Sequence, residues 1–271
     1  MTATAPPPTR PPEPPARSPH PRIRARRIEI RRGEGRRRLR RLGALGAAVG
    51  MLAVAAALVR SPVLDVDHVR VSGARRTSSA VLLDASGIRR GQAMVDIDTG
   101  LAVRRIEGLP WVERAKVARR WPGTVSVAVV ERTAVAQAAV DGGATILVDR
   151  TGRLLERRAR PAAGLLTIAG LKAVLGQPAG TTIVAARPAL AVVRGLSPAA
   201  AGQVSVVWVA GTDVLLVLRD GGVVRLGGSE ERAAKLQAVD LLLRTIDRRC
   251  LAVADVRVPT APVLTRRPGC A

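Results

Sequence analysis

The chain has 271 residues and a formal net charge of +23, from 44 basic and 21 acidic residues. This length is enough for one large domain or two small ones, and the charge points to an anionic partner such as nucleic acid or a membrane surface. The chain has no Tyr, no Phe and only three Trp, which argues against the aromatic stacking surfaces that bind single-stranded nucleic acid.

Residues 1–41 are predicted to form a disordered, basic arm. Proline is abundant in residues 1–22 and arginine in residues 24–41, and neither composition can bury a core. Residues 42–59 then carry no charge. As a helix they would span about 27 Å, close to the roughly 30 Å hydrocarbon core of a bilayer. The arginines before this segment predict a single-pass, type II anchor in the cell membrane, with the N terminus in the cytoplasm.

A cleaved signal peptide is the main alternative to this anchor, because the small residues 55–57 resemble a cleavage site. Signal peptides, however, have short N-terminal regions and apolar runs of about 7–15 residues. Here a long arm precedes the apolar run, so we favour the uncleaved anchor. We expect the arm to determine orientation and to lie on anionic headgroups, rather than to bind DNA.

Residues 63–132 predict a small α+β domain. Strands are expected over 66–71, 112–119 and 125–129, the last from its alternating valines. Helices are expected after Thr77 or Ser78, ending at Gly87, and over 99–107. The order strand, helix, helix, strand, strand suits two helices on one face of a three-stranded sheet.

Residues 133–260 predict a β-rich domain, followed by a tail over 261–271. One helix is expected over 185–195, and another over 230–244 with Ser229 as its cap. The candidate strands are 134–140, 144–148, 152–155, 204–209, 214–218, 223–226 and 252–258.

Cys250 and Cys270 allow two interpretations. They could form one bridge if this end of the chain is extracytoplasmic. Alternatively, Cys250 is buried and Cys270 is free on the tail. We favour the second interpretation, because spacing alone cannot establish a bridge.

No catalytic, cofactor or metal site is predicted. His20 and His68 have no nucleophile in a recognisable motif, and no Cys/His set has the spacing of metal ligands. Asp96 and Asp98 could pair as acid and base, but aspartates before a helix are more typical of caps. We therefore expect neither an enzyme nor a small-molecule substrate.

Four segments behind the predicted anchor form a recognisable series: residues 66–73 (VDHVRVSG), 119–125 (RRWPGTV), 130–136 (VERTAVA) and 147–155 (LVDRTGRLL). In this order they resemble the FtsQ/DivIB family of bacterial cell-division proteins, in which a POTRA domain and a β domain follow a membrane anchor. One departure is residues 161–170, which lack the Leu-Pro pattern that the family leads us to expect after the 152–155 strand.

This resemblance implies a non-enzymatic scaffold of the divisome, enriched at the septum. It implies that the POTRA domain acts in recruitment, and that the β domain binds FtsB- and FtsL-like bitopic proteins by strand addition. The candidate partner-binding residues are Ala252, Val253, Ala254, Asp255, Val256, Arg257 and Val258. They form either a free sheet edge that can accept a partner strand or an ordinary central strand, and the sequence leaves both open.

Three rival functions remain at this stage. The first is another POTRA-bearing assembly or translocation factor, although such proteins usually carry repeated POTRA units before an outer-membrane barrel. The second is a membrane-anchored envelope enzyme, which would need a nucleophile or a metal cluster. The third is a nucleic-acid binder acting through the basic arm, whose binding would be salt-sensitive.

Overall fold

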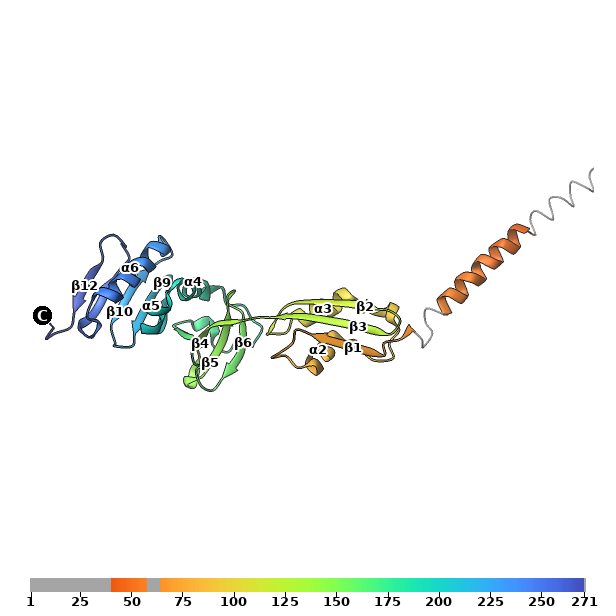
Figure 1. Ribbon diagram of the computed structural model, residues 1–271, viewed down its shortest axis with the longest axis horizontal. Helices are drawn as coiled ribbons and strands as arrows, with labels where there is room; N and C mark the ends of the chain where they lie inside the picture. Colours follow the sequence, from red (N-terminus) through yellow and green to blue (C-terminus); the bar gives the residue numbers. More distant parts are fainter. Residues whose placement is uncertain (1–39, 58–63, 271) are drawn as a thin grey trace, which may run out of the picture. The chain divides into compact units, whose positions relative to one another are not determined.

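A computed structural model describes residues 40–57 and 64–270 of the chain (Figure 1). By their internal contacts the residues fall into two compact units, Met1–Ser61 and Pro62–Ala271. Most of the expected basic arm, residues 1–39, lies outside the described residues.

The first unit contains one described helix, Arg40–Ala57, which is long and apolar enough to cross a membrane. Its mean hydropathy is 1.3 and none of it is buried. The large apolar side chains Leu42, Met51 and Leu52 are each about two-thirds exposed or more. A fully exposed apolar helix is stable where lipid replaces water around it, so this helix fits a membrane anchor. Residues 58 and 59 of the expected anchor lie outside the described residues.

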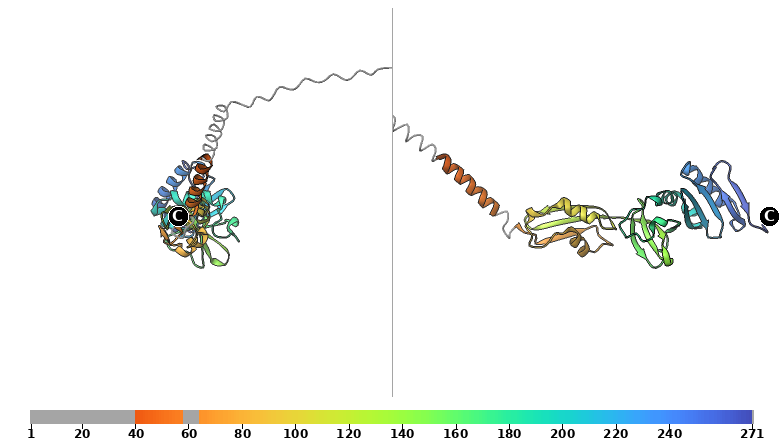
Figure 2. Two further views of the ribbon diagram at one scale, coloured as in Figure 1. Left: turned by 90° about the vertical axis from the view of Figure 1, so that its right-hand side faces the viewer. Right: turned by 180° about the vertical axis from the view of Figure 1, so that it is seen from behind.

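The second unit begins with a three-stranded sheet in the order β1-β3-β2, with β1 parallel and β2 antiparallel to β3. Leu82, Ala102 and Ile106 of the two helices pack on Val125, Val127 and Val129 of the central strand. The elements are β1 His68–Ser72, α2 Ser79–Ser86, η2 Met94–Asp96, α3 Thr99–Glu107, β2 Val112–Arg120 and β3 Thr124–Glu131. The predicted α+β order is confirmed, and it can be followed in Figures 1 and 2.

Local signals fix the helix ends of this part. The Ser78 hydroxyl accepts the Val81 N–H at 3.3 Å, and Gly87 ends α2 in the left-handed conformation. The Asp98 carboxylate accepts the Leu101 N–H at 2.8 Å, and this hydrogen bond holds the pKa of Asp98 below its usual value. Asp98 is therefore a helix cap, the interpretation that the sequence favoured.

Residues from Ala134 onward form a nine-stranded sheet in the order β12-β11-β10-β9-β8-β7-β4-β5-β6. Three pairs are parallel: β4 with β7, β7 with β8, and β10 with β11. The strands are β4 Ala134–Ala139, β5 Thr145–Asp149, β6 Leu154–Arg158, β7 Leu166–Ala169, β8 Val204–Ala210, β9 Asp213–Leu218, β10 Val223–Gly227, β11 Leu251–Asp255 and β12 Val263–Arg266. The predicted β-rich second part is confirmed.

Three α-helices lie among these strands: α4 Arg187–Gly195, α5 Pro198–Gln203 and α6 Arg232–Thr245. Their apolar side chains, such as Leu190 in α4 and Val239 in α6, belong to the same core cluster as Leu216 of β9. Short 3-10 helices occupy η3 Asp141–Gly143, η4 Lys172–Val174, η5 Val184–Ala186 and η6 Arg248–Cys250.

Two expectations about the ends of elements are wrong. Ser229 does not cap α6, because the helix begins after Glu231, whose φ of 47° is left-handed and whose side chain makes no cap hydrogen bond. The segment 261–271 is not simply a tail, because Val263–Arg266 pair with β11 as a ninth strand of the sheet. The second outcome depends on strand pairing that residue type alone does not reveal.

Candidate protein-interaction site

The predicted partner-binding strand lies inside the sheet. Ala252, Val253, Ala254 and Asp255 belong to β11, which pairs in parallel with β10 and antiparallel with β12. Of the two interpretations that the sequence left open, a free edge and a central strand, β11 is therefore the central strand. The physical reason is that residues 263–266 return alongside β11 and occupy its outer hydrogen-bonding groups. Ala254 is fully buried, as expected for a core position of a central strand.

The other three candidate residues follow the end of β11. Val256 is fully buried, and its N–H donates to the Arg225 carbonyl at 3.0 Å. Arg257 forms an ion pair with Asp255 at 2.7 Å, and hydrogen bonds from its guanidinium lower the pKa of that carboxyl. Val258 is 58% exposed. Among these three, only Arg257 and Val258 are accessible to a partner.

The end of the sheet on this side is β12. The Arg267 N–H donates to the Cys250 carbonyl at 2.9 Å, so the backbone groups of Arg267 point toward β11. Because alternate residues of a strand direct their backbone groups to opposite sides, those of Leu264 and Arg266 point away from β11. Val263 and Leu264 are also exposed, at 65% and 45%. This combination of outward backbone groups and exposed apolar side chains is what strand addition requires.

A disulfide joins the two ends of the β11–β12 segment. The sulfur atoms of Cys250 and Cys270 are 2.07 Å apart and the Cα atoms 5.6 Å apart. The favoured expectation of a buried Cys250 and a free Cys270 is therefore wrong. Arg267 adds a second tie, because its guanidinium donates to the Asp220 carbonyl at 2.6 Å. These covalent and polar links attach a strand whose own side chains bury little surface.

Sequence reasoning missed β12, although a signal was present. Val263 and Thr265 are β-branched residues with high strand propensity, and the segment lies between Pro262 and Pro268. Only four residues pair, so the run was too short to distinguish from a tail. The second cysteine just beyond it was the remaining hint.

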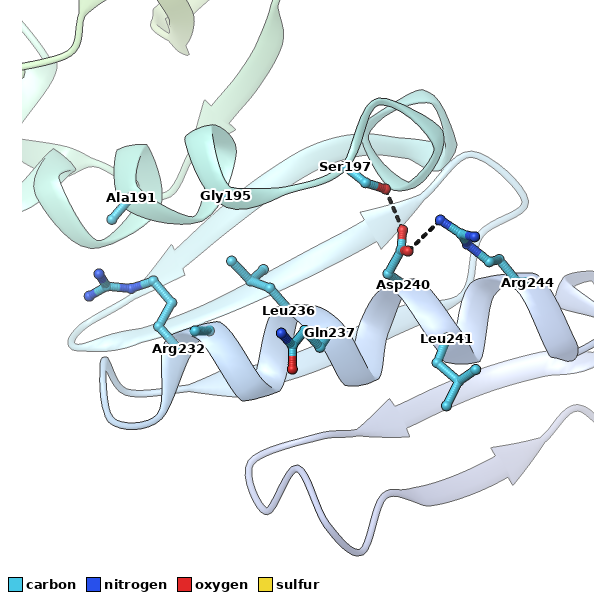
Figure 3. Close-up of a pocket in the computed structure, with 10 residues that line it drawn as sticks. Ala191, Gly195, Ser197, Arg232, Leu236, Gln237, Asp240, Leu241 and Arg244 are labelled. Carbon is cyan, nitrogen blue, oxygen red and sulfur yellow. Dashed lines mark hydrogen bonds and ion pairs between the residues drawn. The ribbon is translucent and has the colours of Figure 1, made fainter.

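A groove of about 630 Å³ lies between α4, the start of α5 and α6 (Figure 3). The Ser197 hydroxyl donates to Asp240, and Arg244 forms an ion pair with the same carboxylate at 2.6 Å. Ser197 also accepts the Ala200 N–H at 3.1 Å as the cap of α5. No histidine lines this groove, so Ser197 and Asp240 account for a cap and not for a nucleophile with its base. Within residues 40–57 and 64–270, no group of three His, Cys, Asp or Glu could hold a metal ion.

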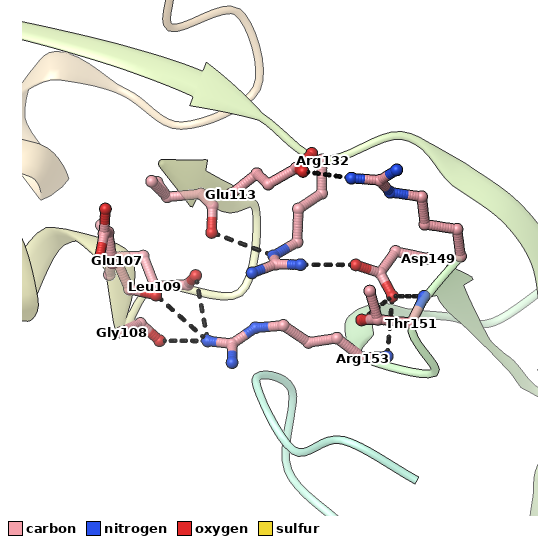
Figure 4. Close-up of polar contacts among 10 residues, drawn as sticks. Glu107, Gly108, Leu109, Glu113, Arg132, Asp149, Thr151 and Arg153 are labelled. Atoms are coloured by element: carbon pink, nitrogen blue, oxygen red, sulfur yellow. Dashed lines mark hydrogen bonds and ion pairs between the residues drawn. The ribbon is translucent and has the colours of Figure 1, made fainter. Parts of the chain in front are cut away.

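A polar cluster connects the end of the first sheet to the β5–β6 turn (Figure 4). Arg132 forms an ion pair with Asp149 at 2.7 Å, and Asp149 is only 2% exposed. The same carboxylate accepts the Thr151 N–H and hydroxyl at 2.8 and 2.7 Å and the Arg153 N–H at 2.9 Å. The Arg153 guanidinium donates to the Gly108 carbonyl at 2.8 Å.

The charge of Asp149 is stabilised by this cluster. Burial by itself raises the pKa of Asp149, but the Thr151 hydroxyl, the Arg132 guanidinium and the two backbone N–H groups together lower it. The buried carboxylate therefore stays ionised and acts as an acceptor for groups from both sheets. The arrangement is structural, because both oxygens of this buried carboxylate accept hydrogen bonds from the chain itself.

Comparison with known proteins gives a consistent result over most of the chain. Residues 64–132 match the model of the FtsQ-type POTRA domain, and residues 136–257 match that of the C-terminal region of cell-division protein FtsQ/DivIB. The strand β12 lies just beyond the second match.

Curated relatives share the same description. The chain is 33% identical over 239 residues to the cell division protein FtsQ of Myxococcus fulvus, covering 84% of this chain and 82% of the relative. It is 31% identical over 240 residues to FtsQ of Streptomyces collinus, covering 85% and 90%. A solved structure of the extracytoplasmic domain of DivIB from Geobacillus stearothermophilus matches with a TM-score of 0.30 and 20% identity, covering 43% of this chain and 98% of that chain.

Proposed function

Because the chain belongs to the FtsQ/DivIB family of cell-division proteins, we propose that it is a non-enzymatic scaffold of the bacterial divisome. In this role the β domain binds FtsB- and FtsL-type bitopic proteins and links early and late components of the machinery. The observation that carries the proposal is the exposed outer edge of β12, where Leu264 and Arg266 direct their backbone groups away from β11.

The anchor supports the placement of this scaffold. The helix Arg40–Ala57 would hold the chain in the cell membrane. The arginines in residues 24–41 would keep the N terminus in the cytoplasm. The two sheets would then lie outside the cytoplasm, where a disulfide such as Cys250–Cys270 persists. We expect the protein to be enriched at the septum, with the POTRA domain acting in its recruitment.

Strand addition at β12 replaces the earlier candidate, residues 252–258, as the binding mechanism. A partner strand lying beside β12 would take up the free N–H and C=O groups of Leu264 and Arg266. Each backbone hydrogen bond contributes about 1 kcal/mol net, so the edge alone gives modest affinity. The exposed apolar side chains of Val263 and Leu264 would supply the remaining contacts.

The experiment compares two substitutions at one position, with the full chain and an FtsB-type partner in detergent. Leu264→Pro removes an outward N–H and crowds an incoming strand, so we expect the affinity to fall about tenfold or more. Leu264→Ala keeps the N–H and loses only side-chain contact, so it should retain most of the binding. Equal affinities for the Pro variant and the wild type would refute strand addition at β12.

A location experiment tests the wider role. A fluorescent fusion at the N terminus should form a band at mid-cell before constriction begins. The Leu264→Pro variant should still reach mid-cell, while the FtsB-type partner no longer does. An even signal around the envelope through the whole cell cycle would contradict the division role and leave the binding result to stand alone.

A further inference from the structure

The helix-free face of the three-stranded sheet is strongly basic. Because Val125, Val127 and Val129 point to the helices, their neighbours in β3 point to the opposite face. The register then places Arg70 of β1 beside Ser126, and Lys116 and Arg120 of β2 beside Ala128 and Thr124. Arg114 lies opposite Val130 on the same face. We call the four cations Arg70, Arg114, Lys116 and Arg120 the basic sheet face.

The strand positions of this face carry no acidic residue, and the nearest unpaired carboxylate among the described residues is that of Asp67, which lies against Gly123 in the turn before β3. Beside the four cations, these strand positions are Ala, Ser, Thr, Val and His68. All four cations are exposed, and none makes an ion pair or a side-chain hydrogen bond among the described residues. The nearby carboxylate of Glu113 binds Arg150, and that of Glu131 binds the N–H groups of Arg76 and Thr77. Four cations without an ion pair on one face of a three-stranded sheet favour an anionic ligand.

An exposed tryptophan lies at one end of the face. Trp121 is 53% exposed, and with Arg70, Arg120, Thr124 and Ser126 it lines an open hollow of about 450 Å³. An indole ring next to arginine side chains is typical of the boundary between lipid and water, where the ring enters the headgroup layer and the arginines bind phosphate. A nearly apolar protein partner would not need the cations, and a soluble anion would not need the indole.

The tryptophan end of the face is also the end at which the chain arrives from the anchor. The Asp67 and His68 N–H groups donate to the Gly123 carbonyl at 2.8 and 3.1 Å, so the Trp121 turn lies beside the start of β1. Only residues 58–63 separate the helix that ends at Ala57 from the first described residue of this part, Leu64. Even a fully extended chain over these seven steps reaches only about 25 Å. Insertion of the helix in a bilayer would therefore keep the start of β1, and the Trp121 turn beside it, within reach of the bilayer surface.

We propose that the basic sheet face docks on the anionic phospholipid headgroups of the membrane that holds the N-terminal helix. Trp121 enters the headgroup layer, and Arg70, Arg114, Lys116 and Arg120 bind lipid phosphate. This goes beyond the proposed scaffold function and depends only on insertion of the helix Arg40–Ala57. Each cation near an anionic bilayer strengthens docking about fivefold, so removing all four weakens it by several hundredfold.

The test uses the full chain in lipid nanodiscs made with or without phosphatidylglycerol. Brominated lipids quench tryptophan fluorescence at short range, and the part of the quenching that Trp121→Phe abolishes reports the position of this side chain. We expect Trp121 to be quenched in anionic nanodiscs at low salt and much less in neutral nanodiscs. High salt should also release it, because the Debye length falls from about 10 Å at 0.1 M to about 3 Å at 1 M.

Two quadruple variants distinguish a specific face from general basicity. Replacing Arg70, Arg114, Lys116 and Arg120 with Gln should abolish the Trp121 quenching. Replacing four exposed arginines of the β domain with Gln removes the same charge and should leave the quenching unchanged; these are Arg157, Arg158, Arg160 and Arg249.

Equal loss in both quadruple variants, or equal quenching in neutral and anionic nanodiscs, would overturn the proposal. If Trp121 is not quenched in nanodiscs and becomes shielded only after an acidic protein is added, the proposal is overturned and the face binds a protein partner instead. A chain that fails to enter nanodiscs would contradict the anchor, and none of these outcomes bears on FtsB-type binding at Leu264.

Discussion

Removal of the Cys250–Cys270 disulfide should both destabilise the β domain and release β12. The bond closes a segment with a sequence separation of 20 residues. In the chain-entropy model, a loop of this length restricts the unfolded chain by about 3 kcal/mol. The double substitution Cys250→Ser and Cys270→Ser should therefore lower the free energy of unfolding by up to this amount.

Loss of the disulfide should affect the local stability of β12 more than the stability of the whole domain. All four side chains of β12 are exposed, so burial contributes little to holding the strand. Without the disulfide, β12 keeps only its backbone pairing with β11 and the Arg267 contacts to Cys250 and Asp220. We expect amide exchange in residues 263–266 to rise well above that of β9 and β10, and FtsB-type binding to weaken with it.

Urea denaturation and hydrogen exchange measured by mass spectrometry would test both effects on the full chain in detergent. Adding a reductant should bring the wild type to the level of the double variant and leave the double variant unchanged. A loss of unfolding free energy below about 0.5 kcal/mol, together with unchanged protection of residues 263–266, would refute the view that the disulfide holds the edge strand.

Three further predictions concern stability. Gly91→Ala should lower the free energy of unfolding, measured in urea, by roughly 1 kcal/mol, and Gly73→Ala should lower it clearly more. Both glycines have positive φ, but a Cβ at residue 73 would overlap the Val129 carbonyl oxygen, whereas a Cβ at residue 91 meets nothing within 4 Å. Leu216→Ala should lower the free energy of unfolding by about 2–5 kcal/mol, because the side chain is fully buried in the second core, and a loss below 1 kcal/mol would contradict that burial. The pKa of Asp149 is lower in the folded than in the unfolded protein, so its contribution to stability is complete above the unfolded pKa near 3.9 and is lost as the pH falls through the folded pKa. In the Asp149→Asn variant the urea midpoint should therefore depend less on pH in this acidic range. An equally steep pH dependence in the variant would assign the effect to other carboxylates.

The sequence alone determined the elements that depend on neighbours along the chain. Helix α3 was predicted over residues 99–107 and is found at Thr99–Glu107. Its cap Asp98 acts within a few residues, since the carboxylate accepts the N–H of Leu101. The alternating valines of β3 likewise fixed which face of that strand is buried, because side chains in a strand alternate with a period of two. The anchor could be read because lipid requires a continuous uncharged run.

The tertiary structure alone decided which strand forms the edge of the second sheet. The seven residues 252–258 read equally well as an edge or a central strand, because alternation reports burial and not the number of neighbouring strands. The position of the edge depended on residues 263–266, a segment too short to predict, and on a bond between two cysteines whose separation did not specify pairing. The free backbone groups of Leu264 and Arg266 exist only because β12 folds back on β11.

The basic sheet face shows the same division. The composition shows an excess of arginine, but only the register of β1, β2 and β3 shows which of the cations share one face. Arg70 lies far from Arg114, Lys116 and Arg120 in the sequence, and the parallel pairing of β1 with β3 brings it to their face. Parallel neighbours must be joined by a long connection, here through α2, α3 and β2, so no local pattern could have revealed that these four cations share one surface.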